Sequence, residues 1–159
     1  MKINYRNYSH LSFDLWLTLI RSNPEFKKKR NLLFKDFFEI NCSIERVNEA
    51  VRYYDVLCNS INEKTGLNLN TYEIYYLILN ALEVDLDANG TERLGEFYKE
   101  TEKLFFNYKP ELIFPDIKLQ FEKMVTEGKS INILSNTGFI NGKTLRKILS
   151  FYEFEDFIS

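Results

Sequence analysis

The sequence contains a single histidine, His10, and only two cysteines, Cys42 and Cys58. The cysteines lack Cys-x-x-Cys spacing and have no histidine partners, so we expect neither a structural zinc site nor a Cys–His nucleophile pair. We interpret His10, which precedes a short apolar stretch, as a surface or boundary histidine with no catalytic role.

An excess of positive charge is also missing, since 21 lysines and arginines face 23 acidic residues and the formal net charge is -2. No basic surface for nucleic acid is therefore expected. No apolar run approaches the roughly 20 residues that a membrane span requires, and residues 1–10 are polar, unlike a secretory signal. We expect a cytoplasmic protein with reduced thiols that binds neither nucleic acid nor a membrane.

The chain does contain 45% hydrophobic and 16% aromatic residues over 159 positions, enough for one domain or a small core with an inserted subdomain. Leu11 to Phe13 are predicted to end a short strand aimed at Asp14. Ser22 and Glu25 have the spacing of a capping box at the start of a helix that runs to about residue 38. Further helices are predicted over residues 43–61, 71–82 with Asn70 as the cap, and 91–107.

The pattern changes after residue 107. Pro110 and Pro115 bracket an extended segment, a helix is predicted over 116–126, and Gly128 stops it. An apolar, β-branched run then ends in small polar residues, before a last helix over about 143–151. This order predicts an α/β fold: a Rossmann-like parallel sheet core, residues 1–21 and 108–159, interrupted by an α-helical subdomain, residues 22–107.

Two predicted strand ends carry polar side chains. One presents Asp14 followed by Thr18, and the other presents the run from Ser135 to Gly138. Ligand sites in parallel sheets lie beyond the carboxyl ends of the strands. If the two strands are neighbours, a carboxylate faces a hydroxyl and nearby backbone N–H groups. Such an arrangement suits nucleophilic attack on a centre whose oxygens the donors hold.

Both stretches resemble motifs of the haloacid dehalogenase-like (HAD) hydrolase superfamily. "FDLWLTL", residues 13–19, is similar to its first motif, an aspartate after an apolar strand with Thr-Leu four residues later. "ILSN", residues 133–136, is similar to its second motif, and the helical insert resembles the family's cap subdomain. The resemblance covers nearly the whole chain.

The resemblance implies roles for individual residues and a small phosphorylated or halogenated substrate. Asp14 would be the nucleophile that forms a covalent aspartyl intermediate, and Thr18 would position its loop. Ser135 would donate to an oxygen of the phosphoryl or carboxylate group, with Asn136 beside it. In the phosphatase branch, Asp14 and the backbone carbonyl of Trp16 would also bind magnesium, whereas a dehalogenase would need no metal.

Trp16 departs from the phosphatase pattern, which usually has a second aspartate here as general acid. Indole has no useful proton to give, and loss of a general acid typically costs about 10²–10⁴-fold in rate. Halide leaves without protonation, and the dehalogenase branch carries an aromatic residue at this position. A phosphatase, a dehalogenase and a catalytically inactive HAD-like binding or scaffold protein therefore stay open.

The sequence ends at Ser159, before the places where the family has its motif-three lysine and its acidic magnesium ligands. "FEDFIS", residues 154–159, resembles the approach to the next strand. Two expectations follow. Either the sequence is a truncated form of the enzyme, or a partner, including a second copy of the chain, completes the sheet beside the strand of Asp14.

Overall fold

A computed structural model describes residues 5–136 and 138–158, which divide into an α/β unit and a helical unit. The α/β unit comprises Met1–Ser22, Pro110–Ser135 and Leu145–Ser159. The helical unit comprises Asn23–Lys109 and Asn136–Thr144. Segment Asn136–Thr144 thus groups with the helices, whereas the sequence placed it in the α/β core. The role of the helical unit as a cap stays a prediction.

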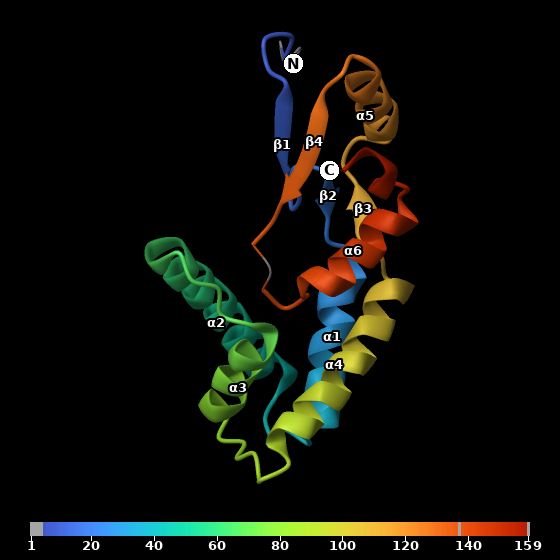
Figure 1. Ribbon diagram of the computed structural model, residues 1–159. Coiled ribbons are helices and arrows are strands. Elements are labelled where there is room, and N and C mark those ends of the chain that lie inside the picture. The colour runs from blue at the N-terminus through green and yellow to red at the C-terminus, as the bar shows by residue number, and fades with distance from the viewer. Residues whose placement is uncertain (1–4, 137, 159) are drawn as a thin grey trace. The chain divides into compact units, whose positions relative to one another are not determined.

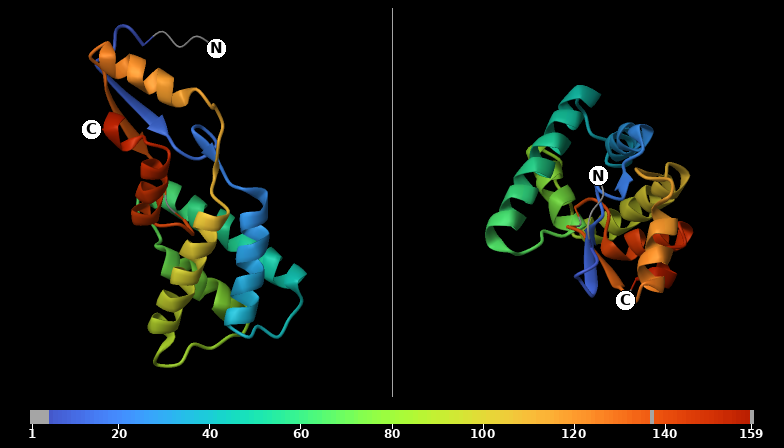
Figure 2. Two further views of the ribbon diagram at one scale, coloured as in Figure 1. Left: turned by 90° about the vertical axis from the view of Figure 1, so that its right-hand side faces the viewer. Right: turned by 90° about the horizontal axis from the view of Figure 1, so that it is seen from above.

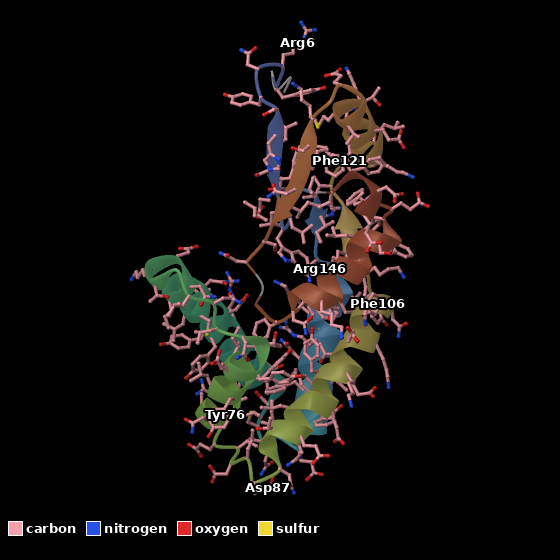
Figure 3. The ribbon with its side chains drawn as sticks, in the orientation of Figure 1. Arg6, Tyr76, Asp87, Phe106, Phe121 and Arg146 are labelled. Atoms are coloured by element: carbon pink, nitrogen blue, oxygen red, sulfur yellow. The ribbon has the colours of Figure 1, made fainter. Side chains whose placement is uncertain are left out.

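The sheet of the α/β unit pairs strand β1 (His10–Asp14) in parallel with β4 (Ser130–Leu134) (Figure 1). Helix α5 (Ile117–Thr126) lies alongside the strands (Figures 1 and 2). Its fully buried Phe121, which Figure 3 labels, packs on Phe13 of β1. The ring centroids are 5.1 Å apart. This parallel pair confirms the predicted α/β class.

On the edge of β4 that does not pair with β1, one further bridge forms. Ile158 forms a parallel bridge with Ile131, directly after the short 3₁₀ helix η1 (Glu155–Phe157). Phe154, just before η1, is fully buried against Phe121. This single bridge is the contact by which the segment that resembled an approach to a strand meets β4.

A second, very short sheet was not predicted. Strand β2 (Ile20–Arg21) pairs antiparallel with β3 (Glu111–Leu112), and Arg21 and Glu111 form an ion pair at 2.8 Å. The sequence indicated only an extended segment between the two prolines. Two-residue strands carry no alternating pattern, because alternation needs four or more residues to be visible.

The helical unit contains α1 (Pro24–Phe37), α2 (Ile44–Thr65), α3 (Thr71–Ala81) and α4 (Gly90–Asn107). Helices α1 and α4 lie side by side (Figures 1 and 2). The most deeply buried members of their shared apolar core include Phe34, Val47, Ile74, Tyr75, Ile78, Leu79 and Phe97. None of the helices in the described ranges is long and apolar enough to cross a bilayer.

The helix caps confirm one prediction and correct another. Asn70 and Glu73 form the capping box of α3, as the sequence predicted for Asn70. At α1, however, the cap is Asn23, whose side chain accepts a hydrogen bond from the Glu25 N–H at 3.0 Å. The expected box of Ser22 and Glu25 is wrong, because Pro24 occupies the first helical position and shifts the cap one residue on.

Candidate active site at the carboxyl ends of the parallel strands

The register of the parallel sheet places two of the predicted site residues at one edge. Asp14, the last residue of β1, pairs with Leu134, the last residue of β4, so Ser135 follows directly at the neighbouring strand end. The sequence analysis made this juxtaposition conditional on the two strands being neighbours. They are neighbours, because both belong to one sheet of the α/β unit.

A tight turn after β1 holds the loop that carries Asp14. Leu15 and Leu19 are both 1% exposed, and the Leu19 N–H donates to the Leu15 carbonyl at 2.9 Å. Leu17 is 82% exposed with a φ of 60°, and its N–H donates to the Ile20 carbonyl at 2.8 Å. Two buried leucines four residues apart thus anchor the turn and leave Leu17 and Thr18 between them at the surface.

The hydroxyl of Thr18 fixes the orientation of the Asp14 carboxylate. Thr18 Oγ1 donates to Asp14 Oδ2 at 2.7 Å, and both residues are exposed. Among residues 5–136 and 138–158, none is seen to donate to Oδ1 of Asp14, and the residue is exposed, which leaves this oxygen open. A carboxylate held by one oxygen and open at the other is suited to nucleophilic attack.

The second motif divides between the two units. Ser135 is half-buried and belongs to the α/β unit with Asp14, whereas Asn136 is exposed and groups with the helical unit. Thr137, part of the polar run predicted at this strand end, lies outside the described residues. Asp14, Thr18 and Ser135 are therefore the predicted site residues that one unit brings together.

Trp16 occupies the middle of the turn after β1. It is half-buried, and it forms a parallel bridge with Ile20 at the start of β2. The side chain at this position is indole, so no proton donor of the carboxylic type stands two residues after Asp14.

The oxygen atoms near Asp14 are of the kind that binds magnesium, but they make up only part of a magnesium site. Magnesium binds through one or two carboxylates, with waters and substrate phosphate oxygens completing an octahedron. Asp14 supplies one carboxylate, and the main-chain carbonyl of Trp16 supplies a neutral oxygen two residues on. Among the residues that the structure describes, no group of three or more histidine, cysteine or acidic side chains forms a metal site.

His10 stands at the opposite end of β1 from Asp14. The two residues are four positions apart in extended strand, roughly 13 Å along the sheet. The exposed His10 ring is hydrogen-bonded through Nδ1 to Ser130 Oγ at 2.7 Å. The interpretation of His10 as a surface histidine agrees with this position, which takes it out of the candidate site.

Sequence reasoning missed a cluster of polar side chains around the chain that follows β4. Tyr98 and Thr144 are hydrogen-bonded at 3.0 Å, and Thr71 donates to the Gly138 carbonyl at 2.9 Å. The partners are 46 and 67 residues apart in sequence. No local pattern of spacing reveals such pairs, because they form only when the helical unit folds.

Comparison with known proteins shows the fold. No family model and no curated protein sequence matches the chain. Among solved structures, the chain is similar to the crystal structure of a predicted phosphoglycolate phosphatase from Haemophilus somnus 129PT, with a TM-score of 0.55 and 17% sequence identity. The match covers 96% of this chain and 60% of that one, so the chain spans less than two thirds of its length. The predicted HAD-like fold is confirmed.

Proposed function

We propose that this chain of HAD-like fold is a hydrolase that uses Asp14 as its nucleophile on a small phosphorylated or halogenated substrate. The observation that carries the proposal is the 2.7 Å hydrogen bond from Thr18 to one oxygen of Asp14, at the strand end next to Ser135. The match of fold to a predicted phosphatase supports the same reaction class.

For a phosphate ester, Oδ1 of Asp14 attacks phosphorus as the bond from phosphorus to the leaving oxygen breaks. The leaving alkoxide takes a proton from water, since Trp16 has none to give. Water then cleaves the acyl phosphate, which returns the Asp14 carboxylate and releases inorganic phosphate. The Ser135 hydroxyl donates to an oxygen of the transferring phosphoryl group, where negative charge develops.

For a halogenated acid, the same Oδ1 attacks the carbon that bears the halogen, and halide leaves with the bonding electrons. Water hydrolyses the resulting aspartyl ester, which gives the hydroxy acid and restores Asp14. In this branch Ser135 donates to the substrate's carboxylate. No proton donor is needed for the leaving group, so Trp16 is fully compatible with this chemistry.

Magnesium belongs to the phosphoryl branch of the proposal. Asp14 and the Trp16 carbonyl would hold it, and it would neutralise charge on the phosphoryl oxygens.

One assay separates the branches. The purified protein is given phosphoglycolate, the compound in the name of the similar structure, or 2-chloropropionate, with added magnesium or with a chelator. Release of phosphate that requires magnesium identifies a phosphatase, and release of chloride that persists in chelator identifies a dehalogenase. Further phosphate esters and haloacids follow if these two are not turned over.

The nucleophile is tested by Asp14→Asn, which removes the attacking oxygen's charge with little change in shape. We expect turnover to fall by roughly 10³-fold or more, the scale on which loss of a nucleophile acts. Asp85→Asn is the matched control, because Asp85 is exposed on the loop before α4 in the helical unit. Full turnover by the Asp14→Asn variant would refute the proposal.

A binding or scaffold role without catalysis is the second candidate, and Trp16 in the place of a general acid favours it. It predicts that wild-type protein binds inorganic phosphate or a haloacid, that Asp14→Asn and Ser135→Ala change this binding, and that neither product is released. Robust turnover by the wild-type protein would exclude it.

A further inference from the structure

Helix α2, the longest helix of the helical unit (Figure 1), has an apolar stripe on each of two faces. The covered stripe lies in the core of the helical unit and consists of Val47, Val51 and Cys58. The second stripe consists of Tyr53 and Val56, which are 62% and 53% exposed, and the half-buried Leu57. At 3.6 residues per turn it lies roughly 150° around the helix from the first. A surface helix normally presents a polar face there, so the described residues leave a second apolar face of α2 uncovered.

Tyr53 is held in place on this outer face. Its ring packs edge-on against Tyr54, with 5.2 Å between the centroids and 87° between the planes. Tyr54 itself packs against the apolar core of the helical unit. An exposed aromatic side chain fixed in this way loses little conformational entropy when a partner covers it, which favours binding.

Charged side chains stand at both ends of the exposed stripe. Arg46 and Glu49 precede it and form an ion pair at 3.7 Å, and Glu63 and Lys64 follow it; all four are exposed. The ion pairs among the described residues include neither Glu63 nor Lys64. Each end therefore carries one charge of each sign, which favours a partner with the same mixed pattern over a strongly charged one.

The pattern is complementary to itself when two copies of α2 pair antiparallel. A two-fold axis between positions 56 and 57 places Glu49 opposite Lys64 of the second copy, and the symmetry repeats this pair. The same axis places Tyr53 opposite Ser60 of the second copy, where a small side chain leaves room for the ring. A parallel pair would instead bring Glu49 against Glu49 and Lys64 against Lys64, and like charges repel.

We propose that this face of α2, residues 49–64, is an interface at which two copies of the chain pair antiparallel. The pairing covers Tyr53, Val56 and Leu57 of both copies and joins Glu49 of each copy to Lys64 of the other. The inference concerns the helical unit alone, and it does not depend on the proposed function.

The size of the face predicts a weak dimer. Residues 49–64 span about 22 Å of helix, and a helix is about 10 Å across. A face of these dimensions is well below the roughly 800 Å² per partner of a standard stable interface. We therefore expect monomer and dimer to exchange, with a dissociation constant on the order of 10–100 µM.

Sedimentation velocity from about 5 to 500 µM protein tests the proposal. The mass of the wild-type protein should move from 19.0 kDa toward twice that value. Val56→Arg brings two cations together near the two-fold axis and should keep the protein monomeric over the whole range. Val56 is more than half exposed, so this variant should fold, and its thermal midpoint at the lowest concentration checks that it does.

Charge reversal tests the register and the antiparallel orientation. Glu49→Lys and Lys64→Glu each turn an attraction into a repulsion at two places in the dimer, and each should raise the dissociation constant about tenfold. The double variant Glu49→Lys/Lys64→Glu restores opposite charges and should return the dissociation constant to within about threefold of the wild-type value. Within one chain the two positions are about four turns apart, so only pairing between copies accounts for such a rescue. Lys99→Glu is the matched control, because it makes the same charge change at an exposed position of α4 and should leave the dissociation constant unchanged.

Three results would overturn the proposal. In the first, the wild-type protein stays at 19.0 kDa up to the highest concentration, which would leave the face to a different kind of partner. In the second, Val56→Arg associates as strongly as the wild-type protein, which would place the interface on another surface. In the third, the double variant dimerises no better than the single variants, which would mean that Glu49 does not meet Lys64 of the second copy. None of these results bears on Asp14, so the proposed function is judged by its own assay.

Discussion

The hydroxyl of Thr18 donates a 2.7 Å hydrogen bond to Oδ2 of Asp14, one turn of chain before it. The buried side chains of Leu15 and Leu19 anchor that turn in the core. The hydrogen bond therefore joins two exposed groups on an anchored turn. The carboxylate is consequently presented in one orientation, at the strand end where Ser135 begins the second polar segment.

Thr18→Val should lower kcat of the active protein about tenfold, because the carboxylate then samples rotamers in which neither oxygen faces the substrate. Thr18→Ser keeps the hydroxyl and should keep at least half of the wild-type kcat. Steady-state rates of phosphate or halide release measure both. A wild-type kcat in Thr18→Val would show that the hydrogen bond to Asp14 does not matter for turnover.

Trp16→Asp should separate the two branches of the proposed function. If the protein is a phosphatase limited by the missing general acid, a carboxylic acid at this position should raise the rate on phosphate esters, by up to about 10²-fold. If it is a dehalogenase, the same change should leave halide release unchanged or lower it. Thermal midpoints are compared as a control, since Trp16 is half-buried and its loss costs packing.

Two alanine substitutions at the start of α1 test the corrected cap. Asn23→Ala removes the side chain that accepts from the Glu25 N–H, and we expect it to lower the free energy of unfolding by about 1 kcal/mol. Ser22→Ala should change it by less than about 0.5 kcal/mol, because Asn23 and not Ser22 caps the helix. Urea unfolding measures both, and a larger loss from Ser22→Ala would restore the box inferred from the sequence.

Tyr75 should make the protein less stable in alkali. Burial raises the pKa of Tyr75 to about 12, above its ordinary value of 10. The folded state therefore holds the proton more tightly than the unfolded chain, and this contribution is complete below pH 10 and is lost as pH rises toward 12.

By pH 11 the free energy of unfolding has lost about 1.4 kcal/mol from this group, the value for one pH unit above the unfolded pKa. Tyr75→Phe cannot ionise, so its unfolding free energy should fall less steeply between pH 9 and 11 than that of the wild-type protein. The difference between the two proteins removes the effect of the other tyrosines. Parallel curves would show that Tyr75 does not titrate on unfolding in this range.

Much of the geometry of the candidate site could be predicted because its signals are local. The apolar run before Asp14 and the one before Ser135 each mark a strand end, and the parallel register then brings the two ends together. Asn70 with Glu73 marks the start of α3 equally well, since both partners lie within one turn.

The rest depends on partners that are distant in the chain. Nothing near Gly138 indicates that Thr71 will hold its carbonyl, and nothing near Asn141 indicates Tyr98. Asn136–Thr144 belongs to the helical unit because of such contacts, so local sequence patterns could not predict it. The predicted cap of α1 was wrong for a local reason. Ser22 and Asn23 are adjacent and both are good caps, and only the folded turn selects one.

The central claim is that Asp14 is the nucleophile, and acid-quenched mass spectrometry during turnover tests it most directly. The account predicts a fraction of the protein heavier by one phosphoryl group, or by the acid left after loss of halide, with the added mass on the peptide that contains Asp14. The adduct should be absent from Asp14→Asn. Turnover at the wild-type rate by Asp14→Asn, or an adduct that maps to a different residue, would contradict it.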